Sequence, residues 1–219
     1  MKEKKLFVWD FHGVLEKGND FAVLEVTNTI LERNGYSERL SIKDCFKLSG
    51  KKWFEYFQYL LPNKSLEILK KLQNECFFYS CNNPQIINKH ILVNDHVNFV
   101  LDKISKSKHE QILISNTTAE SLNIYLELTN LNIFFPEKKH FAADAHSQEK
   151  VNKSIILRKF LKDEKFLKLV TIGDSEGDMI LKKHHKNGTS YLYSHPEKSF
   201  RTNECDYKIN DLRQILVEI

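Results

Sequence analysis

Short apolar segments that end in polar or glycine-containing loops recur along the chain. They cover residues 6–9, 112–114, 167–172 and 191–193, and residues 207–209 resemble them. Such runs are typical of strands that are buried on both faces of a parallel sheet. Helical periodicity appears between them, because Val151, Ile155 and Phe160 recur at helical intervals. Residues 211–217 predict a closing amphipathic helix. This alternation predicts a doubly wound α/β sheet.

Residues 16 to 95 follow a different pattern. Apolar residues such as Val23, Val26 and Ile30 return at helical intervals, and no convincing pair of strands is evident. The pattern predicts a helical insert over residues 16–95. The sheet would then be formed by residues 1–15 and 96–219.

Composition and charge limit the functions that fit this organisation. The chain has 219 residues, of which 41% are hydrophobic, enough for one globular core and a small appendage. Its formal net charge is only +4 and its lysines are scattered, so we expect no nucleic-acid partner. The charged first five residues precede only four apolar ones, far short of a signal peptide or membrane span. We therefore expect a cytoplasmic protein with no membrane partner.

Carboxylates follow two of the expected strands. Asp10 comes directly after residues 6–9, and Asp174 and Asp178 come after residues 167–172. Ligands of open α/β sheets bind at the carboxyl ends of the strands. One such aspartate commonly just caps a turn, but two strand-end placements together favour a shared site. Mg²⁺ prefers oxygen ligands in octahedral geometry, so the pattern predicts a magnesium site.

A third expected strand ends in Ser115 and Asn116, whose side chains could hold phosphoryl oxygens together with helix-entry N–H groups. Taken alone, this pattern is more often a helix N-cap. Lys150 and Lys153 lie at the start of the next predicted helix, and either could offset the charge of a phosphoryl group. The alternative is that both are ordinary surface lysines.

Taken in order, these motifs resemble the haloacid dehalogenase superfamily. They are Asp10 with Gly13, then Ser115, a helix-borne lysine, and Gly173-Asp174 followed by Asp178. The resemblance implies a five-stranded Rossmann-like core with an all-α cap inserted between the first and second motifs, which corresponds to residues 16–95. It also implies a phosphatase that depends on Mg²⁺.

The resemblance assigns roles to the acidic residues. Asp10 would be the nucleophile and would form an aspartyl-phosphate that water then hydrolyses. Mg²⁺ would be held by Asp10, Asp174 and the backbone carbonyl of His12. Asp178 would be a further ligand or would support the others.

The resemblance also assigns the phosphate contacts. Ser115, with Asn116 and Gly13, would bind the phosphoryl group. Lys153 is followed closely by an apolar pair, as the family's lysine is, so we prefer it, with Lys150 as the alternative. Phosphoryl transfer depends on such charge neutralisation and positioning.

His12 departs from the family pattern, because phosphatases of this family usually carry a second aspartate two positions after the nucleophile. That residue acts as general acid and base, a contribution of about 10²–10⁴-fold. Imidazole can do the same work, so we hypothesise that His12 does. Alternatively, His12 only packs against the cap and the enzyme is slow.

Other functions remain open at this level. Halide-removing relatives lack the metal-binding cluster, and phosphomutases normally keep the second aspartate, so a phosphatase is preferred. A non-catalytic binding or regulatory protein on the same fold is the alternative from another class. A capped site favours a small phosphorylated metabolite as substrate, and the chain could be a monomer or a homodimer.

Overall fold

A computed structural model describes residues 4–143, 151–163 and 165–219. The chain forms two compact units, one made of Met1–Lys17 with Val93–Ile219 and the other of Gly18–Leu92. The segments that join them contain two short strands, β2 (Glu16–Lys17) and β3 (Leu92–Val93), which pair with each other.

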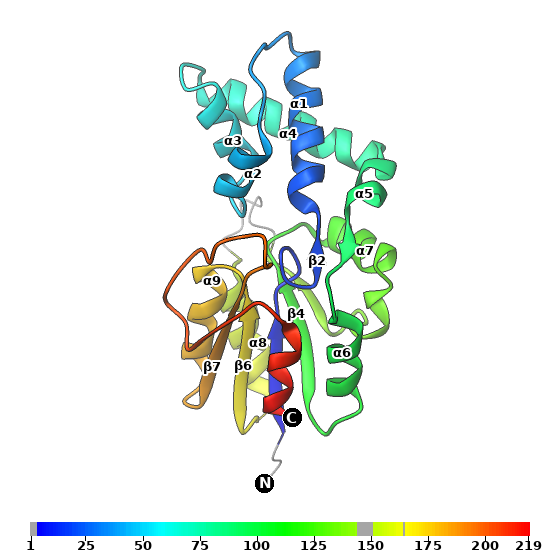
Figure 1. Cartoon of the computed structure of the whole chain (residues 1–219), viewed down its shortest axis with the longest axis vertical. Coiled ribbons are helices and arrows are strands. Elements are labelled where there is room, and N and C mark those ends of the chain that lie inside the picture. Colours follow the sequence, from blue (N-terminus) through cyan, green and yellow to red (C-terminus); the bar gives the residue numbers. More distant parts are fainter. Residues whose placement is uncertain (1–3, 144–150, 164) are drawn as a thin grey trace. The chain divides into compact units, whose positions relative to one another are not determined.

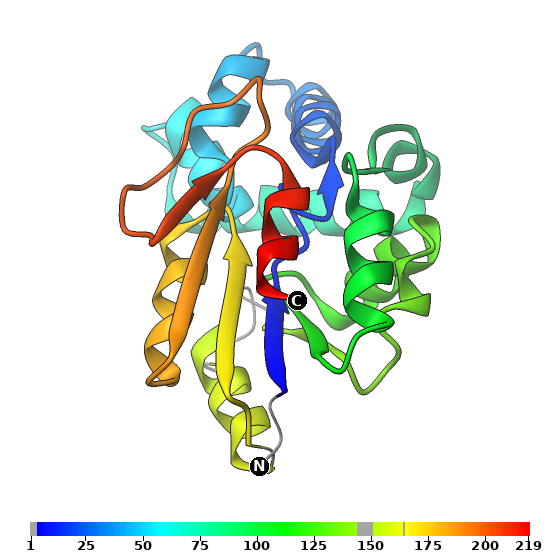
Figure 2. The same ribbon diagram turned by 60° about the horizontal axis from the view of Figure 1, so that its bottom comes forward.

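The first unit contains a parallel six-stranded sheet in the order β5-β4-β1-β6-β7-β8. Its strands are β1 (Lys5–Trp9), β4 (Glu110–Ser115), β5 (His140–Ala142), β6 (Lys168–Gly173), β7 (Gly188–Tyr193) and β8 (Tyr207–Ile209). Figure 2 shows β1, β6 and β7 side by side. The expectation of five strands was wrong by one, because β5 is a three-residue edge strand without an apolar run.

Helices cover both faces of this sheet, as the alternation of strands and helices predicts (Figure 1). Phe7 and Trp9 face a core shared with α6 (Val97–Ser105), α7 (Ala119–Leu128) and η3 (Leu212–Glu218). Leu6 and Val8 point to the other face, where they pack with residues from α8 (Lys153–Asp163) and η2 (Ile180–His184). Side chains alternate along a strand, so β1 contributes to both cores.

Three short helical elements complete this unit. They are η1 (Leu131–Ile133), α9 (Glu176–Met179) and the closing η3. The last was expected as an amphipathic helix over residues 211–217, and it is found as a 3₁₀-helix over Leu212–Glu218. Leu212 and Ile215, three residues apart, are both buried in the core, which suits the three-residue turn of that helix.

The second unit consists of five helices. They are α1 (Asn19–Arg33), α2 (Ile42–Leu48), α3 (Trp53–Leu60), α4 (Leu66–Asn82) and α5 (Pro84–His90). Val26, Ile30, Phe57 and Leu72 form part of its core. The fold class is thus α/β with an inserted all-α unit. Over the described ranges of both units, no helix is long and apolar enough to cross a membrane.

Candidate active site

The two acidic segments meet at one edge of the sheet. β1 and β6 are adjacent and parallel, with Trp9 opposite Ile172, and the backbone N–H of Asp10 donates to the carbonyl of Ile172 at 2.9 Å. One carboxylate oxygen from each of Asp10, Asp174 and Asp178 lies within 4.8 Å of the other two. The structure therefore brings together the three carboxylates that the sequence predicts as metal ligands.

Lys153, the first residue of α8, lies among these carboxylates. Its Nζ is 2.7 Å from Oδ1 of Asp10 and 2.7 Å from Oδ1 of Asp178, and its side chain is only 6% exposed. Burial alone lowers the pKa of Lys153, but the two carboxylates outweigh it and raise the pKa above its usual range. Of the two candidate lysines, Lys153 is thus placed at the site, whereas Lys150 lies outside the described residues.

Asp178 and Asp174 have partners other than Lys153. Ser175 donates to Oδ2 of Asp178 from its backbone N–H at 3.2 Å and from its hydroxyl at 2.5 Å, in a capping box at the start of α9. Arg201, in the segment between β7 and β8, places Nη1 2.8 Å from Oδ2 of Asp174. No sequence signal points to Arg201, because nothing in its spacing links it to the motifs.

Burial and mutual repulsion perturb two of the carboxylates. Burial, followed by the charge of Asp178, raises the pKa of Asp10 to about 6 even though Lys153 opposes this. Burial also raises the pKa of Asp174 to about 7, against the opposing effect of Arg201. Among the described residues, three carboxylates outnumber the two cations that contact them, Lys153 and Arg201. A cluster of oxygen donors that is short of positive charge fits a divalent cation.

Ser115 ends β4, the strand on the other side of β1. It is 1% exposed, and its hydroxyl has no hydrogen-bond partner within the described ranges. The N-cap of α7 is Thr118 rather than Ser115, since the Thr118 hydroxyl accepts from the N–H of Ser121 at 3.2 Å. Asn116 is exposed. A buried hydroxyl without a partner is costly, so Ser115 fits a ligand oxygen better than a cap.

Gly13 has a φ of 75°, and a Cβ there would overlap Oδ2 of Asp174. The glycine therefore leaves room for a carboxylate of the cluster, in addition to any contact with phosphate.

His12 lies beside an acidic residue that sequence reasoning missed. Its Nδ1 is 3.0 Å from Oε1 of Glu16, which is 1% exposed. Burial lowers the pKa of His12, but Glu16, Asp10 and Asp174 together raise it above 6.5. Glu16 could have been noticed as an acid four residues after His12, although no motif marks it.

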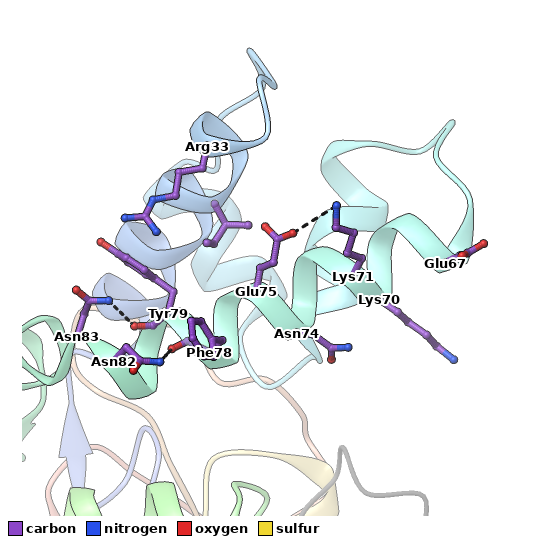
Figure 3. A pocket seen from close by; sticks show the side chains of 11 residues that line it. Arg33, Glu67, Lys70, Lys71, Asn74, Glu75, Phe78, Tyr79, Asn82 and Asn83 are labelled. Atoms are coloured by element: carbon purple, nitrogen blue, oxygen red, sulfur yellow. Dashed lines mark hydrogen bonds and ion pairs between the residues drawn. The ribbon is translucent and has the colours of Figure 1, made fainter.

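The helical unit has a hollow of its own, between α1 and α4 (Figure 3). Three of its charged residues contact other residues of the unit. Lys71 lies 3.7 Å from Glu75, and Arg33 lies over the ring of Tyr79 at 4.3 Å. Phe78 is 73% exposed at this surface. None of these contacts indicates a particular ligand.

The parallel sheet and the acidic cluster at its edge match the class of protein that the sequence motifs suggest. The family model for haloacid dehalogenase-like hydrolases matches residues 7–186. The chain belongs to this family. No curated protein matches it.

Solved structures share the fold over almost the whole chain. One is a candidate phosphatase from Clostridium difficile, with 14% identity, a TM-score of 0.78 and coverage of 100% of this chain and 99% of that one. A family hydrolase from Deinococcus radiodurans, solved with phosphate and sodium, has 12% identity, a TM-score of 0.69 and coverage of 100% and 97%. A family protein of unknown function from Agrobacterium tumefaciens has 17% identity, a TM-score of 0.67 and coverage of 98% of each chain.

Proposed function

We propose that this hydrolase is a Mg²⁺-dependent phosphatase that transfers the phosphoryl group of a small metabolite to Asp10 and then to water. The observation that carries the proposal is the meeting of Asp10, Asp174 and Asp178 within 4.8 Å, with Lys153 in contact with two of them. The phosphate bound by the Deinococcus radiodurans hydrolase supports a phosphate group as the ligand of this protein.

The binding groups in this proposal are those that the family resemblance implies. Asp10, Asp174 and the backbone carbonyl of His12 would hold Mg²⁺, with Asp178 as a further ligand or as support. When bound, Mg²⁺ supplies positive charge that offsets the phosphoryl oxygens. The unpartnered hydroxyl of Ser115 would donate to one phosphoryl oxygen. Asn116 and the backbone of Gly13 would complete the phosphate contacts.

In the first step, a carboxylate oxygen of Asp10 attacks phosphorus and the bond to the leaving oxygen breaks. Lys153 keeps the carboxylate oriented and reduces the repulsion between it and the incoming anion. His12 gives its proton to the leaving oxygen. The product of this step is an aspartyl-phosphate and a released alcohol.

In the second step, water attacks the phosphorus of the aspartyl-phosphate. His12, now neutral, accepts a proton from that water, and Asp10 is restored as phosphate departs. The placement of His12 two residues after the nucleophile and its contact with Glu16 support this role.

We further propose that the helical unit, Gly18–Leu92, acts as the cap and supplies contacts that select the substrate. A cap that excludes water favours a small phosphorylated metabolite. The enzyme would work in the cytoplasm as a monomer or homodimer, without nucleic acid or membrane.

Phosphate release from a generic aryl phosphate, measured with and without Mg²⁺, tests the proposal. We expect Asp10→Asn to abolish turnover, because an amide is a poor nucleophile, and wild type to show a transient mass increase of one phosphoryl group. Asp102→Asn is the matched control, since Asp102 lies on α6 and pairs with Lys106 at 2.8 Å on the surface. Wild-type turnover by Asp10→Asn would contradict the mechanism.

The alternative, a non-catalytic binding protein, is favoured only by the histidine at position 12. It predicts that Mg²⁺ and phosphate bind to the wild-type protein by calorimetry while no member of a substrate panel releases phosphate.

A further inference from the structure

Glu16 is a buried carboxylate that the proposed chemistry does not use. It is 1% exposed and does not belong to the acidic cluster. Its Oε1 accepts from the backbone N–H of Gly13 at 3.1 Å and lies 3.0 Å from Nδ1 of His12. One oxygen therefore contacts both the loop and the imidazole that follow the proposed nucleophile.

The backbone of this loop fixes Glu16 near His12. The N–H groups of Val14, Leu15 and Glu16 all lie within 3.3 Å of the carbonyl oxygen of Phe11, which folds the chain tightly back on itself. The left-handed backbone of Gly13, with a φ of 75°, permits this turn. The contact between Glu16 and His12 is thus set by the main chain.

A residue from the other end of the insert holds the same loop. Asn94 donates from its side chain to the carbonyl of Val14 at 2.9 Å and from its backbone to the carbonyl of Leu15 at 3.0 Å. Asn94 is 3% exposed, and its side chain also contacts the hydroxyl of Tyr193 at 3.0 Å. The loop is therefore attached to β7 and is not a freely moving segment.

The imidazole of His12 is restrained from its other sides as well. Its ring lies edge-on to Phe11 and to Tyr125, with both centroid distances 5.2 Å. The side chain keeps a 26% exposed fraction. Two aromatic rings and one carboxylate thus limit rotation of the imidazole and leave part of it accessible.

The chemistry of the pair determines which nitrogen carries the hydrogen. An ionised carboxylate can only accept hydrogen bonds, so Nδ1 of His12 must be the donor toward Glu16. In the neutral ring the hydrogen then sits on Nδ1, and Nε2 has its lone pair available. Nε2 has no hydrogen-bond partner in the part of the chain that the structure describes. It is the nitrogen that could exchange a proton with substrate or water.

We propose that Glu16 is a positioning residue that orients His12 and fixes its Nδ1–H tautomer, so that Nε2 is the atom that gives and takes the proton. This inference rests on the proposed phosphatase function, in which His12 is the acid and base. A pair made of the Glu16 carboxylate and the His12 imidazole would then do the work of the family's second aspartate. Glu16 would act through the imidazole alone.

The direct test is the ¹⁵N spectrum of His12 with ring-labelled histidine, at alkaline pH where the ring is neutral. We expect the wild type to carry the hydrogen on Nδ1. In Glu16→Gln the amide can donate as well as accept, so part of the population should move to the Nε2–H tautomer. A wild-type ring with its hydrogen on Nε2, or a spectrum unchanged by Glu16→Gln, would overturn the proposal.

A double-mutant cycle separates positioning from a merely structural role. Glu16→Gln should lower kcat by about 10- to 100-fold, a part of what general acid–base catalysis contributes, and leave KM unchanged. The same substitution in a His12→Ala background should have no further effect, because the residue acts through the imidazole. An equal loss in both backgrounds would overturn the proposal.

Glu110→Gln is the matched control. Glu110 is also a buried glutamate, 9% exposed, and it pairs with Lys4. It is the first residue of β4, at the opposite end of the strand from Ser115 and the site. This variant should keep wild-type kcat. If the wild type hydrolyses no phosphate ester, the proposed function fails. The ¹⁵N spectrum then still decides separately whether Glu16 orients His12.

Discussion

Removing the amine of Lys153 should destabilise the sheet unit strongly. The substitution Lys153→Met keeps most of the length and packing of the side chain but deletes its charge. Nζ of Lys153 is 2.7 Å from both Asp10 and Asp178, and these side chains are 6%, 11% and 3% exposed. The variant would leave buried carboxylates that repel one another with no cation between them.

The size of the effect follows from this burial. Breaking a buried ion pair by removing one partner costs about 3–5 kcal/mol, because the remaining charge is desolvated and unpaired. An exposed pair is worth about 0–1 kcal/mol. We therefore expect Lys153→Met to lower the free energy of unfolding by about 3–5 kcal/mol in the absence of Mg²⁺. Added Mg²⁺ should recover part of the loss, since it would supply positive charge to the same carboxylates.

Urea unfolding at neutral pH measures this difference. The chain has two tryptophans, Trp9 in the sheet unit and Trp53 in the helical unit, so a Trp53→Phe background lets Trp9 fluorescence report on the sheet unit alone. Lys106→Met is the control, because Lys106 is 74% exposed and pairs with Asp102. A loss below about 1 kcal/mol for Lys153→Met, the range of an exposed pair, would refute this reasoning.

Two further substitutions test other parts of the sheet unit. Gly13→Ala should weaken Mg²⁺ binding, measured by calorimetry, because the new Cβ overlaps Oδ2 of Asp174. We expect a loss of about 10- to 100-fold, the usual effect of disturbing groups around a metal ligand. Unchanged affinity would contradict the assigned site. Glu218→Gln should cost about 1–3 kcal/mol at neutral pH, since Lys168 contacts both carboxylate oxygens at 2.6 and 2.8 Å. Burial raises the pKa of Glu218, but Lys168, Lys5 and other partners outweigh this and lower it below 4.5. Its stabilisation is therefore fully present above pH 4.5 and is lost as pH falls through the lowered pKa. Urea unfolding of both proteins from neutral to acidic pH should show the difference shrinking, and a constant difference would count against this ion-pair cluster.

Much of the fold is predictable from local pattern. The run Leu6–Trp9 predicts a strand, and β1 is found there as Lys5–Trp9. In contrast, β5 begins with His140 and has three partly buried residues, so no apolar run marks it. A short edge strand depends on pairing with its neighbour, here β4, and that pairing is not encoded in local periodicity.

The sequence by itself determined the parallel sheet and the placement of Asp10 and Asp174 at strand ends. Parallel strands put their carboxyl ends at one edge, so two acidic strand ends imply one site without any coordinates. Only the tertiary structure decided that Lys153 contacts Asp10, that Arg201 pairs with Asp174 and that Glu16 meets His12. The contacts of Lys153 and Arg201 depend on where long side chains from separate segments end in space, and no spacing along the chain records that. The contact between Glu16 and His12 lies within one loop, but it depends on the tight turn after Asp10, which no motif marks.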